Sequence, residues 1–195
     1  MSHRIFTTQA LVVSAEPFGE ANRWFLFLTP DLGLIRVRAQ GIRWGTSKLK
    51  ASLPLYGLAE VSLVRGREQW LVVGARADDR LAPLLARGAG RSLAAQVSRL
   101  LIRLLAGEEG NPSLFEGVVA GLVAAAQAPT AAAFYQCELV LVLRVLANLG
   151  YVRWDGELAH LASFDHGWQA VVTEATLPQA EILSAINQAL KHSQL

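Results

Sequence analysis

Five basic residues and no acidic residue lie between Leu32 and Ala59, and a tryptophan lies among them. The set comprises Arg36, Arg38, Arg43, Lys48 and Lys50, with Trp44 as the aromatic residue. Binding of single-stranded nucleic acid needs cations along the phosphates and exposed rings that stack on bases. Because no acidic residue in this segment neutralises the positive charges, the sequence predicts a nucleic-acid-binding surface here.

Further arginines extend the predicted surface from neighbouring strands and one turn: Arg23, Arg65 and Arg67. A second interpretation stays open, in which Arg36 and Arg38 form only the solvated face of a strand. In that interpretation Trp44 packs under its loop instead of stacking on bases.

The charge distribution supports the first interpretation. The chain has 195 residues, 52% of them hydrophobic and 17% charged, with a net charge of +2. Residues 1–80 hold eleven basic and seven acidic residues, whereas residues 81–195 hold seven basic and nine acidic ones. A polyanion is therefore the expected partner of the first part.

Catalytic and metal-binding patterns are missing from the sequence. The four histidines (His3, His160, His166 and His192) have no metal-ligand spacing, and no P-loop, G-x-S-x-G or H-E-x-x-H occurs. Cys137 is the single cysteine, which excludes an intramolecular disulfide framework. We therefore expect a protein that is not an enzyme, with no metal and no cofactor.

The first 79 residues have the pattern of five short strands. Apolar and basic residues alternate from Ile35 to Gln40, which places Arg36 and Arg38 on the face opposite Ile35 and Val37. The other strand-like runs are Ala10–Ala15, Trp24–Leu28, Ala59–Leu63 and Trp70–Ala75. Five strands with short turns favour a small barrel of the OB type, because closure hides the strand edges.

From residue 80 onward the apolar spacing is helical. Thr130 is expected to cap a helix that is apolar almost all round and ends at Gly150. We therefore predict an α+β fold, with an N-terminal five-stranded OB-fold barrel over residues 1–79 and a mostly helical domain over 80–195. A small hairpin is expected at 158–173, around the turn-forming residues that precede Trp168.

The mean hydropathy of +0.31 raises the question of a membrane helix. The longest apolar stretch, residues 131–149, carries Gln136, Glu138 and Arg144, so it is interpreted as a buried helix. No sustained apolar run follows His3 and Arg4, so no secretory signal is expected. The expected location is the cytoplasm, associated with the nucleoid.

An ordered set of short segments resembles the RecO family of DNA-repair recombination mediators. The segments are Ala10–Val13, Pro17–Arg23, Leu28–Arg36, Ala39–Arg43, Ser47–Leu49, Leu53–Tyr56 and Arg65–Arg67, followed by Glu138–Leu139 and Leu149–Tyr151. They are dense in the first 75 residues and sparse beyond residue 80.

The resemblance implies an OB-fold followed by a helical domain in a protein that is not an enzyme. Members of this family bind single- and double-stranded DNA and anneal complementary strands. They assist recombinase loading together with RecR, and they dock the acidic tail of the single-strand DNA-binding protein. DNA contacts carry over to the matching positions Arg36, Arg38, Arg43 and Lys48.

The sequence departs from the family in its second part. Many members have a pair of Cys-x-x-Cys motifs near the position where this chain has Val152-Arg153-Trp154-Asp155, so the zinc module is absent. Tyr135-Gln136 stands where some relatives have arginines, and a carboxylate tail needs a cation. The remaining candidates for tail docking are Arg99, Arg103 and Arg144. The chain is also short for this family, as expected of a reduced member.

Two other functions remain open at this stage. The apolar second part is compatible with an adaptor that binds proteins and meets DNA only incidentally. An OB-type RNA-binding protein is also compatible, because the sequence contains no feature that distinguishes the 2′-hydroxyl group.

Overall fold

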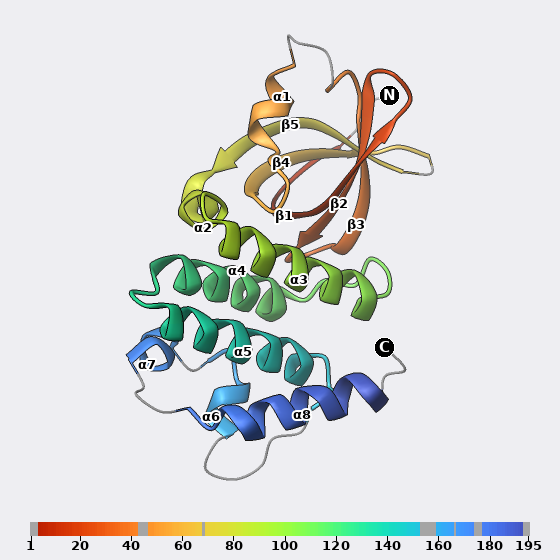
Figure 1. Cartoon of the computed structure of the whole chain (residues 1–195). Helices are drawn as coiled ribbons and strands as arrows, with labels where there is room; N and C mark the ends of the chain where they lie inside the picture. The colour runs from red at the N-terminus through yellow and green to blue at the C-terminus, as the bar shows by residue number, and fades with distance from the viewer. Residues whose placement is uncertain are drawn as a thin grey trace. The chain divides into compact units, whose positions relative to one another are not determined.

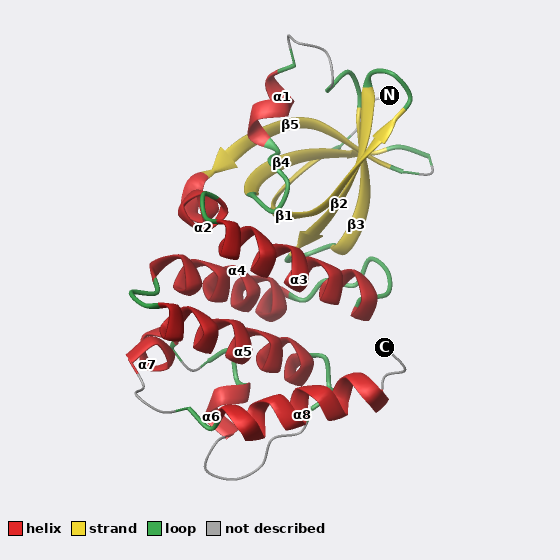
Figure 2. Ribbon diagram, viewed as in Figure 1, coloured by secondary structure: helices red, strands yellow, loops and turns green. Residues whose placement is uncertain are grey.

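The computed structural model describes residues 4–42, 47–67, 69–152, 159–165, 167–173 and 177–192 (Figure 1). It divides into two compact units, Met1–Pro112 and Ser113–Leu195. The first unit contains a β-barrel and the second contains helices (Figure 2). The predicted α+β class is confirmed.

The barrel is built from five strands in the closed order β1-β2-β3-β5-β4. They are β1 (Ile5–Phe18), β2 (Asn22–Thr29), β3 (Gly33–Ala39), β4 (Leu58–Arg65) and β5 (Trp70–Asp78). All neighbouring pairs are antiparallel except β3 and β5, which are parallel. The short helix α1 (Lys48–Ser52) lies in the long connection from β3 to β4. This arrangement confirms the predicted OB-fold.

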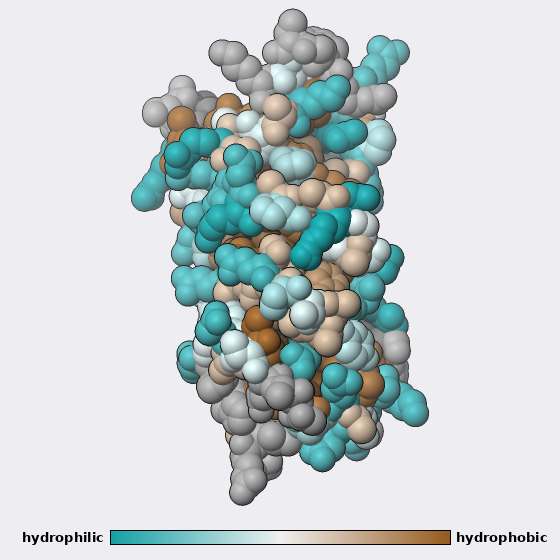
Figure 3. Space-filling model, turned by 60° about the vertical axis from the view of Figure 1, so that its left-hand side comes forward, coloured by the Kyte–Doolittle hydropathy of each residue, from teal (hydrophilic) through white to brown (hydrophobic). Residues whose placement is uncertain are grey.

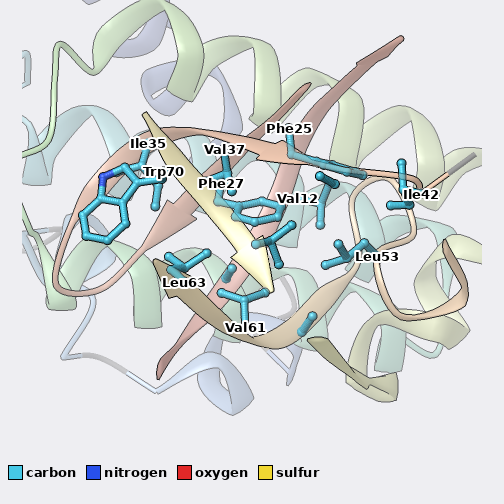
Figure 4. Close-up of a cluster of buried hydrophobic side chains, with 14 residues drawn as sticks. Val12, Phe25, Phe27, Ile35, Val37, Ile42, Leu53, Val61, Leu63 and Trp70 are labelled. Carbon is cyan, nitrogen blue, oxygen red and sulfur yellow. The ribbon is translucent and has the colours of Figure 1, made fainter. Parts of the chain in front are cut away.

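The barrel interior is filled by alternate residues of each strand (Figure 4). On β3, Ile35 and Val37 are fully buried, whereas Arg36 between them is exposed. On β2, Phe25 and Phe27 are buried, with ring centroids 5.5 Å apart. The period-two pattern therefore sets which side chains reach the outer face.

The turn between β2 and β3 lies directly against the segment that contains Glu109 and Gly110, which follows helix α3 (Gly88–Leu104). Gly33 has a φ of 64°, and a Cβ there would lie 2.2 Å from the carbonyl oxygen of Glu109. A Cβ on Gly110 would lie 2.4 Å from the carbonyl oxygen of Asp31. Only glycine permits this backbone approach, which fixes the segment against the barrel.

Three further helical segments belong to the first unit: η1 (Asp79–Leu81), α2 (Ala82–Leu85) and α3 (Gly88–Leu104). α3 is amphipathic, with Leu93, Val97 and Leu101 buried and Arg99 and Arg103 exposed. Strands give way to helices near residue 79, where the sequence predicted the domain boundary. Helices α2 and α3 nevertheless belong to the same compact unit as the barrel, and α3 packs against β1.

The second unit is arranged around one long helix. Its helices are α4 (Pro112–Gln127), α5 (Ala131–Asn148), α6 (Ala159–Ala162), α7 (Trp168–Thr173) and α8 (Gln179–His192). α5 packs against α6, α7 and α8. As predicted, Thr130 caps α5 by accepting a hydrogen bond from the Ala133 amide at 3.1 Å. Gly150, with a φ of 80°, ends it.

In place of the hairpin predicted at 158–173, the described residues of this segment form helices α6 and α7. Val171 is the third residue after Trp168, a spacing that puts both side chains on one side of a helix and on opposite sides of a strand. The rings of Phe164 and Trp168 lie over Gly117 and Gly121 of α4, where added Cβ atoms would lie 2.1 and 2.7 Å from them. Because the Trp168 ring packs on Gly121 and Val171 is buried, both side chains face the core, and a helix allows this whereas a strand does not.

Among the described residues, α5 is the one helix whose length and composition would suit a membrane span. It is instead a core helix of its unit, since Val140, Leu141 and Leu143 are fully buried against its neighbours. On the face drawn in Figure 3, teal hydrophilic side chains predominate and the brown hydrophobic ones form small patches.

Candidate nucleic-acid interface

Strands β2 and β3 present their non-core side chains together on the outside of the barrel. Trp24 is the register partner of Arg38, and Leu26 is the register partner of Arg36. Because Phe25, Phe27, Ile35 and Val37 occupy the interior, Trp24, Leu26, Arg36 and Arg38 share the outer face.

Two arginines on this face lie over aromatic rings. The Arg36 guanidinium carbon lies 4.4 Å from the Trp24 ring centroid, and that of Arg38 lies 5.2 Å from the Phe18 ring. The Phe18 and Trp24 rings are themselves neighbours, with centroids 5.5 Å apart. We call Phe18, Trp24, Arg36 and Arg38 the arginine–aromatic face. The rings hold both guanidinium groups close to the strands by cation–π attraction.

The carboxylate on the same side as this face is that of Glu16, the register partner of Trp24, and the arginines of the face form no ion pair within the described chain. There, no carboxylate lies within ion-pair distance of Arg36 or Arg38. The Nε atom of Arg38 is buried and has no hydrogen-bond partner among the described residues. Two positive charges and two rings are thus available for a ligand.

Other arginines of the first unit are already paired. Arg65 forms an ion pair with Glu108, and its guanidinium carbon lies 4.8 Å from the Trp70 ring centroid. Arg76 pairs with Glu60 at 3.4 Å. Arg80 pairs with Asp78 at 2.8 Å, and its hydrogen bonds lower the pKa of the Asp78 carboxyl group. These charges are less available to phosphates.

The remaining residues predicted for the surface are distributed differently. Arg23 alternates with Trp24 and follows the core side of β2, so the structure does not bring it to the arginine–aromatic face. Lys50 is exposed in α1, and Arg67 is exposed between β4 and β5. Arg43 and Trp44 lie outside the described residues, as does the side chain of Lys48.

The three arginines predicted for partner binding fall into two groups. Arg99 and Arg103 are exposed on α3 in the first unit. Arg144 of α5 is fully buried, so its place in the prediction is wrong, because an acidic tail cannot reach a side chain enclosed in the core.

Arg144 instead holds the segment around α6 and α7. Its Nε donates a hydrogen bond of 2.9 Å to the carbonyl oxygen of Leu161, and its guanidinium carbon lies 4.4 Å from the Trp168 ring centroid. Burial lowers the pKa of Arg144 to about 10 and raises the pKa of the Cys137 thiol to about 11. The contacts of Arg144 with Leu161 and Trp168 therefore indicate a structural role for this side chain.

Sequence reasoning missed two residues of the face, Phe18 and Trp24. Phe18 lies beyond the strand-like run predicted at Ala10–Ala15, although β1 continues to that residue. Trp24 was counted as one residue of an apolar run. Extending the period-two alternation to β2 places Trp24 on the non-core side and would have found it. Within the described chain, no group of three metal-ligating side chains occurs.

Comparison with known proteins finds a match over the part of the chain that contains the barrel. Residues 1–72 match the family model described as "Recombination protein O N terminal", which covers the strands that carry the arginine–aromatic face. The first part of the chain is thus similar to the N-terminal domain of the RecO family.

Curated relatives described as DNA repair protein RecO are similar over part of this chain. A DNA repair protein RecO of Dehalococcoides mccartyi (strain ATCC BAA-2266 / KCTC 15142 / 195) is 34% identical over 111 residues, which is 57% of this chain and 44% of that relative. The DNA repair protein RecO of Synechococcus elongatus is 41% identical over 64 residues, 33% of this chain and 24% of that relative. The matches thus span less than half the length of these relatives.

Proposed function

We propose that this protein is a DNA-binding recombination mediator in DNA repair. It binds single- and double-stranded DNA, anneals complementary strands and assists the loading of recombinase onto single strands. The similarity of residues 1–72 to the RecO family supports a role in recombinational repair, and the binding and annealing steps are our proposal for this chain.

The observation that carries the proposal is the pairing of unneutralised arginines with rings on strands β2 and β3. In OB-folds, this strand face is the one that binds oligonucleotides. The guanidinium groups of Arg36 and Arg38 would contact phosphates, since no described carboxylate competes for them. Phe18 and Trp24 would supply stacking surfaces for bases.

Partner proteins belong to the same proposal. RecR and the single-strand DNA-binding protein are the partners that the family resemblance suggests. Because Arg144 is buried, the exposed Arg99 and Arg103 are the remaining candidates for docking of the acidic tail.

The direct test is a fluorescence-anisotropy titration of a labelled single-stranded DNA oligonucleotide, with RNA of the same sequence in parallel. We expect the double variant Arg36→Ala/Arg38→Ala to bind at least about tenfold more weakly, since hydrogen bonds between charged groups contribute about 1.5–3 kcal/mol each. Arg76→Ala is the matched control, because that side chain is 79% exposed and pairs with Glu60.

Each other outcome would reject part of the proposal. Failure of the folded wild type to bind any oligonucleotide would favour the protein adaptor. Tighter binding of RNA than of DNA would favour an RNA-binding protein. Equal losses in the double variant and in Arg76→Ala would place the binding surface elsewhere.

A further inference from the structure

A cavity of about 380 Å³ opens beside the arginine–aromatic face, wholly within the first unit. Its lining includes Ser14, Glu16, Trp24, Leu26 and Arg36 of the barrel and Ile102 of α3. The volume lies within the range of roughly 300–1,000 Å³ that is typical of small-molecule sites. The cavity is therefore large enough for one small organic group.

The walls of this cavity differ in chemistry. Leu26 and Ile102 are apolar, and Ile102 is 40% exposed on α3. The Arg36 guanidinium group lies over the Trp24 ring, so a flat, polarisable surface forms another wall. Ser14 and Glu16 supply a hydroxyl group and a carboxylate. A flat, neutral group with N–H donors on its edge fits these walls.

Phosphate does not fit inside the cavity, because the carboxylate of Glu16 repels anions and the apolar walls offer no hydrogen bonds. Cations lie around it instead. Arg99 is three residues before Ile102 on α3 and four before Arg103, spacings that make Arg99 a neighbour of both side chains on the helix surface. Both arginines are exposed, and neither forms an ion pair with a described carboxylate.

We propose that this cavity holds one unpaired base of a single DNA strand, with the adjoining phosphates on Arg36 from the barrel and Arg99 and Arg103 from α3. The inference rests on the proposed function and adds a base-binding subsite to it. It also adds α3 to the nucleic-acid surface, so DNA and the acidic tail would compete for Arg99 and Arg103.

The test compares two oligomers of equal charge by fluorescence anisotropy: a deoxycytidine 12-mer and a 12-mer of abasic residues. Stacking contributes about 1–3 kcal/mol per base, so wild type should bind the deoxycytidine oligomer about tenfold more tightly. Ile102→Ser should remove most of this difference. Ile5→Ser is the matched control, because Ile5 is 60% exposed and is the register partner of Val64, outside the cavity lining.

The arginines of α3 are tested separately. Arg99→Ala/Arg103→Ala should weaken binding of both oligomers alike, and should reduce the slope of log K against log salt by about 1.4 on a single strand. Arg76→Ala is again the control. Thermal unfolding of each variant establishes that the loss is not caused by misfolding.

The outcomes separate this inference from the proposed function. If wild type binds both oligomers equally, or if Ile102→Ser keeps the full preference for bases, the subsite is rejected while DNA binding stands. An unchanged slope in the α3 double variant would reject the role of α3. If wild type binds neither oligomer, the proposed function itself fails.

Discussion

Arg144 is a buried charge whose Nε atom is hydrogen-bonded, whereas its Nη1 and Nη2 atoms have no hydrogen-bond partner among the described residues. Its guanidinium group is enclosed in the second unit, where it contacts the Leu161 carbonyl oxygen and the Trp168 ring. Arg144→Ala would leave that carbonyl group without its donor and would create a cavity. We expect the free energy of unfolding to fall by about 2–4 kcal/mol in denaturant titrations.

Arg103→Ala is the control for this change, since an exposed arginine should alter the free energy of unfolding by no more than about 0.5 kcal/mol. If Arg144→Ala were as stable as Arg103→Ala, the role of Arg144 in holding α6 and α7 would be refuted.

The neighbouring thiol provides a second residue-scale prediction. Burial raises the pKa of Cys137 from 9.0 to about 11, and the thiolate is the reactive form. Iodoacetamide should therefore alkylate the native protein at pH 8 about 100-fold more slowly than the protein in urea. The raised pKa also means that this thiol stabilises the fold below pH 9, an effect lost as the pH rises through 11. Equal alkylation rates in buffer and in urea would contradict the burial.

At the scale of the element, Gly117 and Gly121 of α4 leave the space that the rings of Phe164 and Trp168 occupy. A Cβ on Gly117 would lie 2.1 Å from the Cδ1 atom of Phe164, so the ring must move if a methyl group is added. Gly117→Ala should lower the free energy of unfolding by about 1–3 kcal/mol, as overpacking does elsewhere. Gly167→Ala is the control in the neighbouring segment, where an added Cβ meets no atom within 4 Å. Equal stability of the two variants would contradict the close packing of the Phe164 ring against Gly117.

The elements also show which features a sequence can reveal. The barrel strands were predictable, because Ile35 to Gln40 alternates with a period of two and each turn contains Gly, Pro or Asp. The face formed by Arg36 and Arg38 followed from the same alternation. The aromatic partners of these arginines could not be predicted in this way, because the approach of Phe18 and Trp24 depends on strand register. Residues 158–173 were misassigned because Gly117 and Gly121, which receive their rings, lie more than 40 residues away in the sequence.

At the scale of the whole molecule, the first compact unit extends to Pro112. Leu81, Leu84 and Leu101 are fully buried in it, and Gly33 lies against the backbone of Glu109. A fragment of residues 1–112 should therefore unfold in one cooperative transition and bind single-stranded DNA. A fragment of residues 1–79 lacks these contacts and should have a clearly lower midpoint in urea. Equal midpoints for the two fragments would show that α2 and α3 are dispensable for the barrel.

The central claim is that Arg36 and Arg38 of the arginine–aromatic face contact the phosphates of a single strand. The most direct measurement is the slope of log K against log salt for single-stranded DNA, in the full chain and in Arg36→Ala/Arg38→Ala. Each lost phosphate contact reduces the steepness by about 0.7, so the double variant should be flatter by about 1.4, with Arg76→Ala unchanged. A double variant with the wild-type slope would contradict the account.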